Sequence, residues 1–220
     1  MRLCSLLLST ALLVLPLPLL ADTVTLSSTG TGWCQGGSYP YCSNTNVNSA
    51  QNYGAVAYNT SDPINDWFAV NLSGVTGPVL SATLSIYNPE SYITGSDSFL
   101  LYNASNFTYV GLESGPIIGS VSVTQALQGQ NVTISLNATG IADLNAALGS
   151  EFVFGGVLAS SNTVDSIFGY SGAIPAELQL TVPTPPPPPP AVMPEPSSLV
   201  LLGTGVLGSV AGFRRRLRQA

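Results

Sequence analysis

The sequence predicts an all-β protein whose body is a single β-sandwich, jelly-roll-like domain with one short helix. Short runs that alternate, or that are rich in β-branched residues, recur along the chain, and Gly, Asn, Pro and Ser separate them. Only residues 140–148 have helical spacing. The segment 22–182 is long enough for one domain with a substantial core. About ten short strands over this length are typical of a two-sheet sandwich or jelly roll.

The strands follow from local pattern. In the run from Val132 to Leu136, the alternation predicts that Val132, Ile134 and Leu136 face the core, and Leu84 and Ile86 follow the same rule. Within the helix, Ile141, Leu144 and Leu148 share a face. In chain order, the expected strands are 23–28, 55–59, 67–72, 80–87, 99–102, 109–112, 120–124, 132–137, 152–158 and 177–182.

The first 21 residues are expected to form a secretory signal peptide that directs export through the Sec machinery. Arg2 supplies the positive start, residues 6–20 the apolar stretch, and Ala21 a small residue at the cleavage point. Leu19 is larger than the residue usually found two positions before the cut, which leaves the exact position open. An uncleaved anchor is the alternative, but two prolines in the stretch argue against a persistent helix.

A second apolar segment, 197–213, precedes four arginines near the C-terminus. A helix of this length is about 25 Å long, slightly shorter than a hydrocarbon core of roughly 30 Å. The arginine side chains can reach the interface and extend the span. We therefore expect a transmembrane helix whose basic end stays cytoplasmic while the domain faces outward. The basic residues that stop the segment are Arg214, Arg215, Arg216 and Arg218.

Residues 183–192 are expected to be a proline-rich linker between the domain and this tail. Residues 185–190 are all proline, which favours a stiff, extended chain that rises about 3.1 Å per residue. A docking ligand for a partner with an aromatic groove is the alternative.

The tail 193–220 contains MPEPSSLVLLGTGVLGSVAGFRRRLR, in which P-E-P, an apolar run with L-L-G-T-G and a basic end follow in order. This tail resembles the PEP-CTERM sorting signal of exported bacterial proteins. The resemblance implies a Gram-negative host that makes extracellular polysaccharide. It also implies recognition of Pro194, Glu195 and Pro196 by an exosortase, a membrane-embedded transpeptidase that removes the tail. The family unites unrelated bodies, so the resemblance concerns sorting and not activity.

A second resemblance concerns the body. The run WFAVNLSGV at 67–75, followed by SATLSIY at 81–87, resembles a passage of secreted bacterial jelly-roll modules, some of which bind carbohydrate. Asn71 stands where those modules often have aspartate. This resemblance implies the fold and not the ligand.

The charge pattern excludes several functions. Of the 11 acidic residues only Glu195 lies outside 22–190, so this segment has ten acids, no base and a charge of −10, against −6 for the chain. Nucleic acid would be repelled. Without histidine, lysine or arginine the domain lacks a Ser-His-Asp triad, a Schiff-base lysine and a phosphate clamp. We expect no enzyme activity and no cofactor, although paired carboxylates of a glycosidase need no base.

Cys34 and Cys42 are the two cysteines of the exported chain, since Cys4 lies in the signal peptide. An even number in an oxidising compartment predicts a disulfide, which would add roughly 2–3 kcal/mol. Gly36, Gly37 and Pro40 permit the tight turn between them. Two free thiols or a metal pair are the alternatives, but this spacing without histidine matches no zinc site.

Two further clusters are candidate binding residues. Trp33, Tyr39 and Tyr41 lie near the cysteines, where aromatic rings can stack on sugars; the alternative is that they plug one end of the sandwich. Asp62, Asn65 and Asp66 group oxygen-bearing side chains that Ca²⁺ would accept, but they fit no standard loop motif, and a polar turn is the alternative.

Taken together, the sequence predicts an exported, non-enzymatic protein of the cell surface or extracellular matrix. It is expected to be anchored transiently in the inner membrane and then released through its tail. A carbohydrate-binding module for extracellular polysaccharide is the first alternative, and a secreted carbohydrate-active enzyme is the second.

Overall fold

The computed structural model describes residues 21–38, 40–43, 55–56, 61–104, 106–160, 162, 164–169 and 174–184. The chain divides into two compact units, Met1–Thr184 and Pro185–Ala220, and every described residue belongs to the first. The signal peptide up to residue 20, the proline run and the sorting tail lie outside the described residues. Within the described ranges, no helix has the length and apolar character that a membrane span requires.

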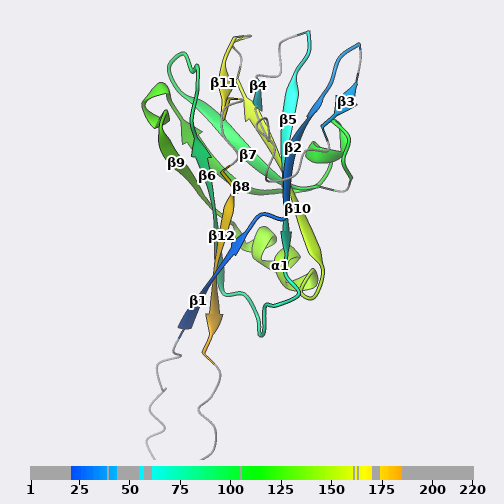
Figure 1. The fold of residues 1–220 in the computed structure, drawn as a ribbon, viewed down its shortest axis with the longest axis vertical. Helices are drawn as coiled ribbons and strands as arrows, with labels where there is room; N and C mark the ends of the chain where they lie inside the picture. The colour runs from blue at the N-terminus through cyan, green and yellow to red at the C-terminus, as the bar shows by residue number, and fades with distance from the viewer. Residues whose placement is uncertain are drawn as a thin grey trace, which may run out of the picture. The chain divides into compact units, whose positions relative to one another are not determined.

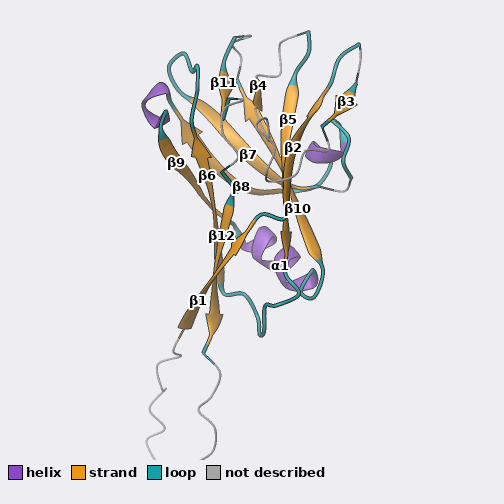
Figure 2. Ribbon diagram, in the orientation of Figure 1, coloured by secondary structure: helices purple, strands orange, loops and turns teal. Residues whose placement is uncertain are grey.

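The described residues form twelve strands, one α-helix and two 3₁₀ helices (Figure 2). The helix α1 is Ala138–Ala146, and the 3₁₀ helices are η1 (Gly111–Glu113) and η2 (Gln125–Leu127). The strands are β1 (Ala21–Ser27), β2 (Gly30–Gln35), β3 (Tyr41–Cys42), β4 (Ala55–Val56), β5 (Ile64–Asn71), β6 (Ser81–Asn88), β7 (Asp97–Asn103), β8 (Ile117–Val123), β9 (Gln130–Ser135), β10 (Glu151–Ala159), β11 (Ser166–Ile167) and β12 (Glu177–Pro183).

These strands form two antiparallel sheets, which confirms the predicted all-β, sandwich-like class (Figure 1). The four-stranded sheet has the order β1-β12-β6-β9. The eight-stranded sheet has the order β11-β4-β5-β10-β7-β8, with β2 paired to β5 and β3 paired to β2. A bridge between Gly119 and Leu136 joins β8 to the chain just after β9, so the two sheets also meet along one edge.

The core lies between the sheets and follows the predicted alternation. Leu84, Ile86 and Ile134 of the four-stranded sheet are fully buried, and they belong to the same cluster as Phe68 and Phe154 of the eight-stranded sheet. Leu136 is only partly buried, because it lies just beyond the end of β9.

The predicted helix is also found, two residues earlier than expected. Its N-terminus is capped by Asn137, whose side chain accepts a hydrogen bond from the backbone N–H of Gly140 at 3.0 Å. Leu144 is fully buried, and Ile141 and Leu148 pack partly buried against the core, so the predicted apolar face is correct.

Nine of the ten expected strand segments contain an observed strand, and the prediction for 109–112 is wrong. That segment forms a turn and η1. The backbone N–H of Leu112 donates to the carbonyl of Thr108, and the N–H of Gly111 donates to the Thr108 hydroxyl at 3.0 Å. These local hydrogen bonds satisfy the backbone without a ladder, so the β-branched and aromatic composition misled the prediction.

Strands β2, β3 and β11 were not predicted, and β2 is the most instructive of the three. Its sequence contains Gly30 and Gly32, which remove the alternation that marks a strand. A Cβ on Gly32 would lie 2.6 Å from Nε1 of Trp67, so glycine is required where the indole crosses the neighbouring strand. The close packing of Trp67 thus requires a glycine in β2, and that glycine removes the alternating pattern by which a strand is predicted.

The two ends of the domain lie side by side. β1 pairs with β12 along its whole length, from Ala21 opposite Pro183 to Ser27 opposite Glu177, and the pair projects from one end of the domain (Figure 1). Ala21, the first described residue, therefore pairs with Pro183, the last residue of β12.

Candidate functional site

The disulfide between Cys34 and Cys42 organises the first candidate region. The two residues are direct partners in the β2–β3 ladder, with Cα atoms 4.0 Å apart, and the predicted bond is confirmed. Because the ladder here is only two residue pairs long, the covalent bond is what holds β3 on the sheet. The neighbouring residues Trp33 and Tyr41 are positioned by this link.

Trp33 and Tyr41 contact each other, on strands rather than on the loops that the sequence indicated. Their ring centroids are 5.7 Å apart with the planes at 63°, an edge-to-face pair. Tyr41 is opposite Gln35 in the ladder, and Gln35 shares a sheet face with Trp33, so both rings lie on that face. Tyr41 is 62% exposed and Trp33 is half-buried. Tyr39 lies outside the described residues.

The second tryptophan of the chain has a structural role. Trp67 is 7% exposed, its indole N–H donates to the carbonyl of Ser43 at 3.3 Å, and Phe107 packs against its ring with centroids 4.9 Å apart. The side chain therefore belongs to a small cluster on the outer side of β5 that includes Leu112.

The structure does not bring the three calcium candidates together. Asp62 is exposed in the bend before β5, whereas Asn65 and Asp66 are consecutive strand residues and point to opposite faces of the sheet. Asn65 turns its amide donor to the carbonyl of Tyr109 at 3.1 Å and to Glu113 Oε2 at 3.3 Å. Within the described ranges, no group of three His, Cys, Asp or Glu residues is arranged to hold a metal ion.

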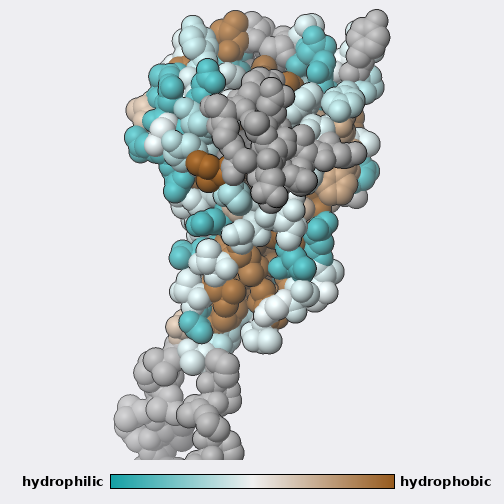
Figure 3. Space-filling model, viewed as in Figure 1, coloured by the Kyte–Doolittle hydropathy of each residue, from teal (hydrophilic) through white to brown (hydrophobic). Residues whose placement is uncertain are grey.

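A cavity that the sequence did not predict lies between β4, β11 and the segments around residues 90 and 125. We call it the β4–β11 pocket. Its volume is about 410 Å³. Ala55 and Ile167 lie behind its wall and are fully buried, and the polar residues lining it are Glu90, Ser91, Tyr92, Gln125, Gln128 and Ser166. The described surface of this end of the domain is mostly hydrophilic or neutral, with isolated apolar residues (Figure 3).

Hydrogen bonds hold the walls of this pocket in place. Tyr92 and Ser166 exchange two backbone hydrogen bonds of 2.8 and 2.7 Å. Gln125 donates through Nε2 to the carbonyl of Ser91 and to Oε1 of Gln128, and it accepts from the backbone N–H of Ile93. No sequence motif could have indicated the pocket, because its lining comes from four segments between residues 55 and 169.

A pair of carboxylates lies close to the pocket, next to Ser166. Burial, followed by a hydrogen bond with Asp165, raises the pKa of Asp97. For Asp165 burial acts in the same direction, but hydrogen bonds from Asp97, from the Thr94 N–H at 3.1 Å and from the Ser160 hydroxyl at 3.0 Å outweigh it, and the pKa of Asp165 is lowered. Asp165 is fully buried and cannot reach a substrate.

Comparisons with known proteins identify the tail. Residues 194–216 match the family model described as PEP-CTERM protein-sorting motif, which confirms the predicted resemblance. A search of the curated proteins gives no match.

Among solved structures, the chain is similar to the Clostridium thermocellum N-terminal endo-1,4-β-D-xylanase 10B, described as CBM22-1–GH10 modules complexed with xylohexaose. The identity is 15% and the TM-score is 0.31, over 78% of this chain and 30% of that chain. The chain thus spans less than a third of the length of the protein it matches.

Proposed function

We propose that this chain, an exported protein that carries a PEP-CTERM sorting motif, is a non-enzymatic component of the cell surface or extracellular matrix. In this proposal an exosortase removes the tail after export, and the β-sandwich domain is then delivered outside the cell. The observation that carries the proposal is the motif match at residues 194–216. In the sequence this motif follows the last strand of the domain, which ends at Pro183.

The disulfide supports an extracytoplasmic destination. Structural disulfides persist in oxidising compartments such as the periplasm and the cell exterior, and are rare in the cytosol. In this domain the Cys34–Cys42 bond secures a strand that has only two ladder pairs. A location outside the cytoplasm is therefore the one in which the observed fold is maintained.

The position of β1 agrees with removal of the signal peptide near Ala21. Residues from Asp22 onward are paired with β12, so a cut after Ala21 would leave nearly the whole ladder intact. The paired ends also mean that the domain is attached to the rest of the chain at one end only.

The absence of basic residues from 22–190 supports a role without catalysis of the common kinds. The domain has no histidine or lysine to act as a base near neutral pH, and the described hydrogen-bonded carboxylate pair, Asp97 with Asp165, has one fully buried member. A domain with this charge would repel an anionic polymer and would not repel a neutral, hydroxyl-rich one.

The test is to express the full chain in a host with an exosortase and in the same host without it, and to measure intact masses in membrane and extracellular fractions. We expect loss of the arginine tail and release of the domain only where the enzyme is present. A matched variant with Pro194→Ala, Glu195→Ala and Pro196→Ala should stay intact in the membrane of both hosts. An intact tail on the unaltered chain in both hosts would show that the protein is simply membrane-anchored.

A second candidate function is carbohydrate binding at Trp33 and Tyr41, favoured by their contact and by the 62% exposure of Tyr41. Exopolysaccharide from the host should shift the fluorescence of Trp33, whereas Trp67 is buried and should not respond. Tyr41→Ala should abolish the shift, and Tyr87→Ala, on the four-stranded sheet, should retain it. An unchanged emission spectrum in saturating polysaccharide would eliminate this function.

A further inference from the structure

We propose that the β4–β11 pocket is a binding site for one neutral sugar unit, with the ring of Tyr92 as the stacking surface and the Glu90 carboxylate as a hydrogen-bond acceptor. This inference goes beyond the sorting function and does not depend on it. It also concerns a different set of side chains from the Trp33–Tyr41 pair.

The size and lining of the pocket suit a small ligand. Its volume of about 410 Å³ falls within the range of small-molecule sites, roughly 300–1,000 Å³. Apolar atoms, those of the Tyr92 ring among them, lie beside amide, hydroxyl and carboxylate groups. A sugar ring has the same mixture, because its C–H faces are apolar and its edge bears hydroxyl groups.

Tyr92 presents an aromatic ring that the fold holds in place. Its side chain is 59% exposed, while its backbone is fixed by both hydrogen bonds to Ser166. Tyrosine gives a large contact area at a low cost in conformational entropy, since only two side-chain torsions must be ordered. An exposed ring on a rigid strand bridge is therefore suited to stack on one face of a sugar.

Charge restricts the class of ligand. Among the described residues of the lining, Glu90 is the one ionisable group besides the Tyr92 phenol, and the segment 22–190 contains no Lys, Arg or His. A phosphorylated, sulfated or uronic acid ligand would find no cation in the domain and would meet its net charge of −10. The Glu90 carboxylate can accept hydrogen bonds from hydroxyl groups of a neutral sugar.

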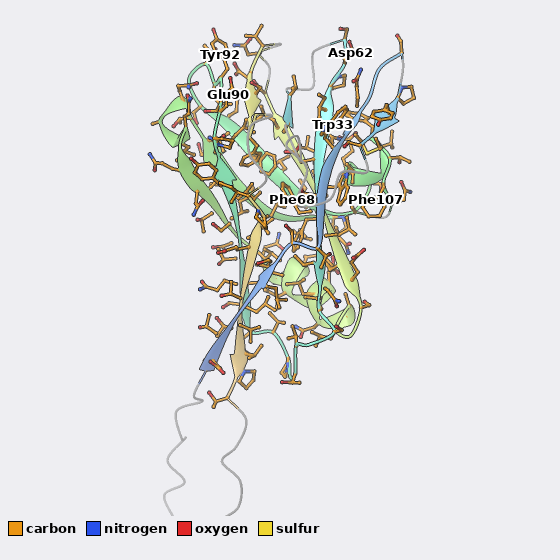
Figure 4. The ribbon with its side chains drawn as sticks, in the orientation of Figure 1. Trp33, Asp62, Phe68, Glu90, Tyr92 and Phe107 are labelled. Carbon is orange, nitrogen blue, oxygen red and sulfur yellow. A yellow bond between two sulfur atoms is a disulfide. The ribbon has the colours of Figure 1, made fainter. Side chains whose placement is uncertain are left out.

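The pocket also lies where a polymer can reach it. Figure 4 places Glu90 and Tyr92 at the end of the domain opposite the projecting β1–β12 pair. The end through which the domain is attached to the rest of the chain is therefore not the end that carries the pocket.

The test uses the full chain purified in detergent, without any exosortase, so that failure of the sorting proposal cannot affect it. The probes are methyl glycosides of glucose, galactose, mannose and xylose, with glucuronate as the anionic analogue, titrated by calorimetry and by saturation-transfer NMR. We expect at least one neutral glycoside to bind more tightly than glucuronate. Failure of all four to bind, or tighter binding of glucuronate, would overturn the proposal.

Four variants locate the site. Tyr92→Ala should weaken binding at least about tenfold, and Tyr92→Phe should retain it because the ring is kept. Tyr87→Ala, on β6 and outside the lining of the pocket, is the matched control and should bind like the unaltered chain. Tyr41→Ala separates the pocket from the other candidate surface. If Tyr41→Ala loses binding while Tyr92→Ala keeps it, the sugar binds at the Trp33–Tyr41 surface and not in the pocket.

Discussion

Asp97 and Asp165 show how a buried carboxylate is accommodated when no base is available. Asp165 is fully buried and accepts from the Thr94 N–H and from the Ser160 hydroxyl. Asp97, whose raised pKa favours its protonated form, supplies a further hydrogen bond. In most proteins a lysine or arginine would take this place, but the domain contains neither. The raised pKa of Asp97 and the lowered pKa of Asp165 follow from placing two carboxylates side by side in a domain without a base.

The two shifts act on stability in opposite directions. The pKa of Asp97 is raised, so its contribution to stability is complete below its ordinary value of 3.8 and is lost as the pH rises through the raised pKa. The pKa of Asp165 is lowered, so its contribution is present above 3.8 and is lost as the pH falls through the lowered pKa. At neutral pH the repulsion between the two carboxylates therefore lowers the stability of the folded domain.

Replacing Asp97 by asparagine should therefore stabilise the protein at pH 7. Asp97→Asn retains an N–H donor for Asp165 and removes one negative charge. We expect Tm to rise by roughly 2–4 °C at pH 7, the size of about 1 kcal/mol for a protein of this length, and the gain to disappear near pH 3. Thermal unfolding at both pH values measures it. Glu177→Gln, which removes an exposed charge, is the control and should change Tm less. A lower Tm for Asp97→Asn at pH 7 would contradict the inferred repulsion between Asp97 and Asp165.

At the scale of the elements, β10 shows how glycine decides a packing arrangement. Gly155 pairs with Trp67 on β5 and with Tyr102 on β7, so it lies in the middle of the eight-stranded sheet. A Cβ at this position would lie 1.8 Å from the carbonyl oxygen of Leu112, which belongs to η1. The short helix can therefore lie directly against the strand only because the strand has no side chain there.

Gly155→Ala should accordingly destabilise the domain, by about 1–3 kcal/mol or more, because the obstacle is backbone and cannot rotate away. Gly74→Ala is the matched control, since a Cβ there would meet no atom within 4 Å. Urea unfolding followed by tryptophan fluorescence gives the free energy of unfolding of both variants. Equal stability of the two would show that η1 can move away from β10 at little cost.

For some elements the local sequence pattern is sufficient to predict the strand and its buried face. Strands β6 and β9 alternate cleanly and were predicted with their core residues, because each has one buried and one solvated face. β2 was not predicted because Gly32 interrupts its alternation. Glycine is needed at this position to leave room for the indole of Trp67, which belongs to β5. Residues 109–112 were misassigned because hydrogen bonds to Thr108 satisfy their backbone locally.

At the scale of the whole molecule, the ten acids of residues 22–190 and the absence of bases mean that no salt bridge between side chains can form in the domain. Its stability comes from apolar burial between the sheets, from the ladders and from the disulfide. The same composition gives the segment 22–190 a net charge of −10, which repels anionic polymers.

The sequence by itself determined the sorting motif, the disulfide, the all-β class and the helix, because each of these depends on residues that are close together in the chain. The P-E-P motif with its arginine cluster, the Cys34–Cys42 spacing and the face of Leu144 can all be recognised within short segments. No knowledge of strand order is required for any of them.

Only the tertiary structure decided which distant residues meet. The β4–β11 pocket, the contact of Trp33 with Tyr41 and the pairing of Asp97 with Asp165 all depend on strand order and register. The separation of Asn65 from Asp66 has the same origin, since neighbours on a strand point to opposite faces. Ladder register is set by burial summed over both sheets, and for that reason no short segment contains the information that builds these sites.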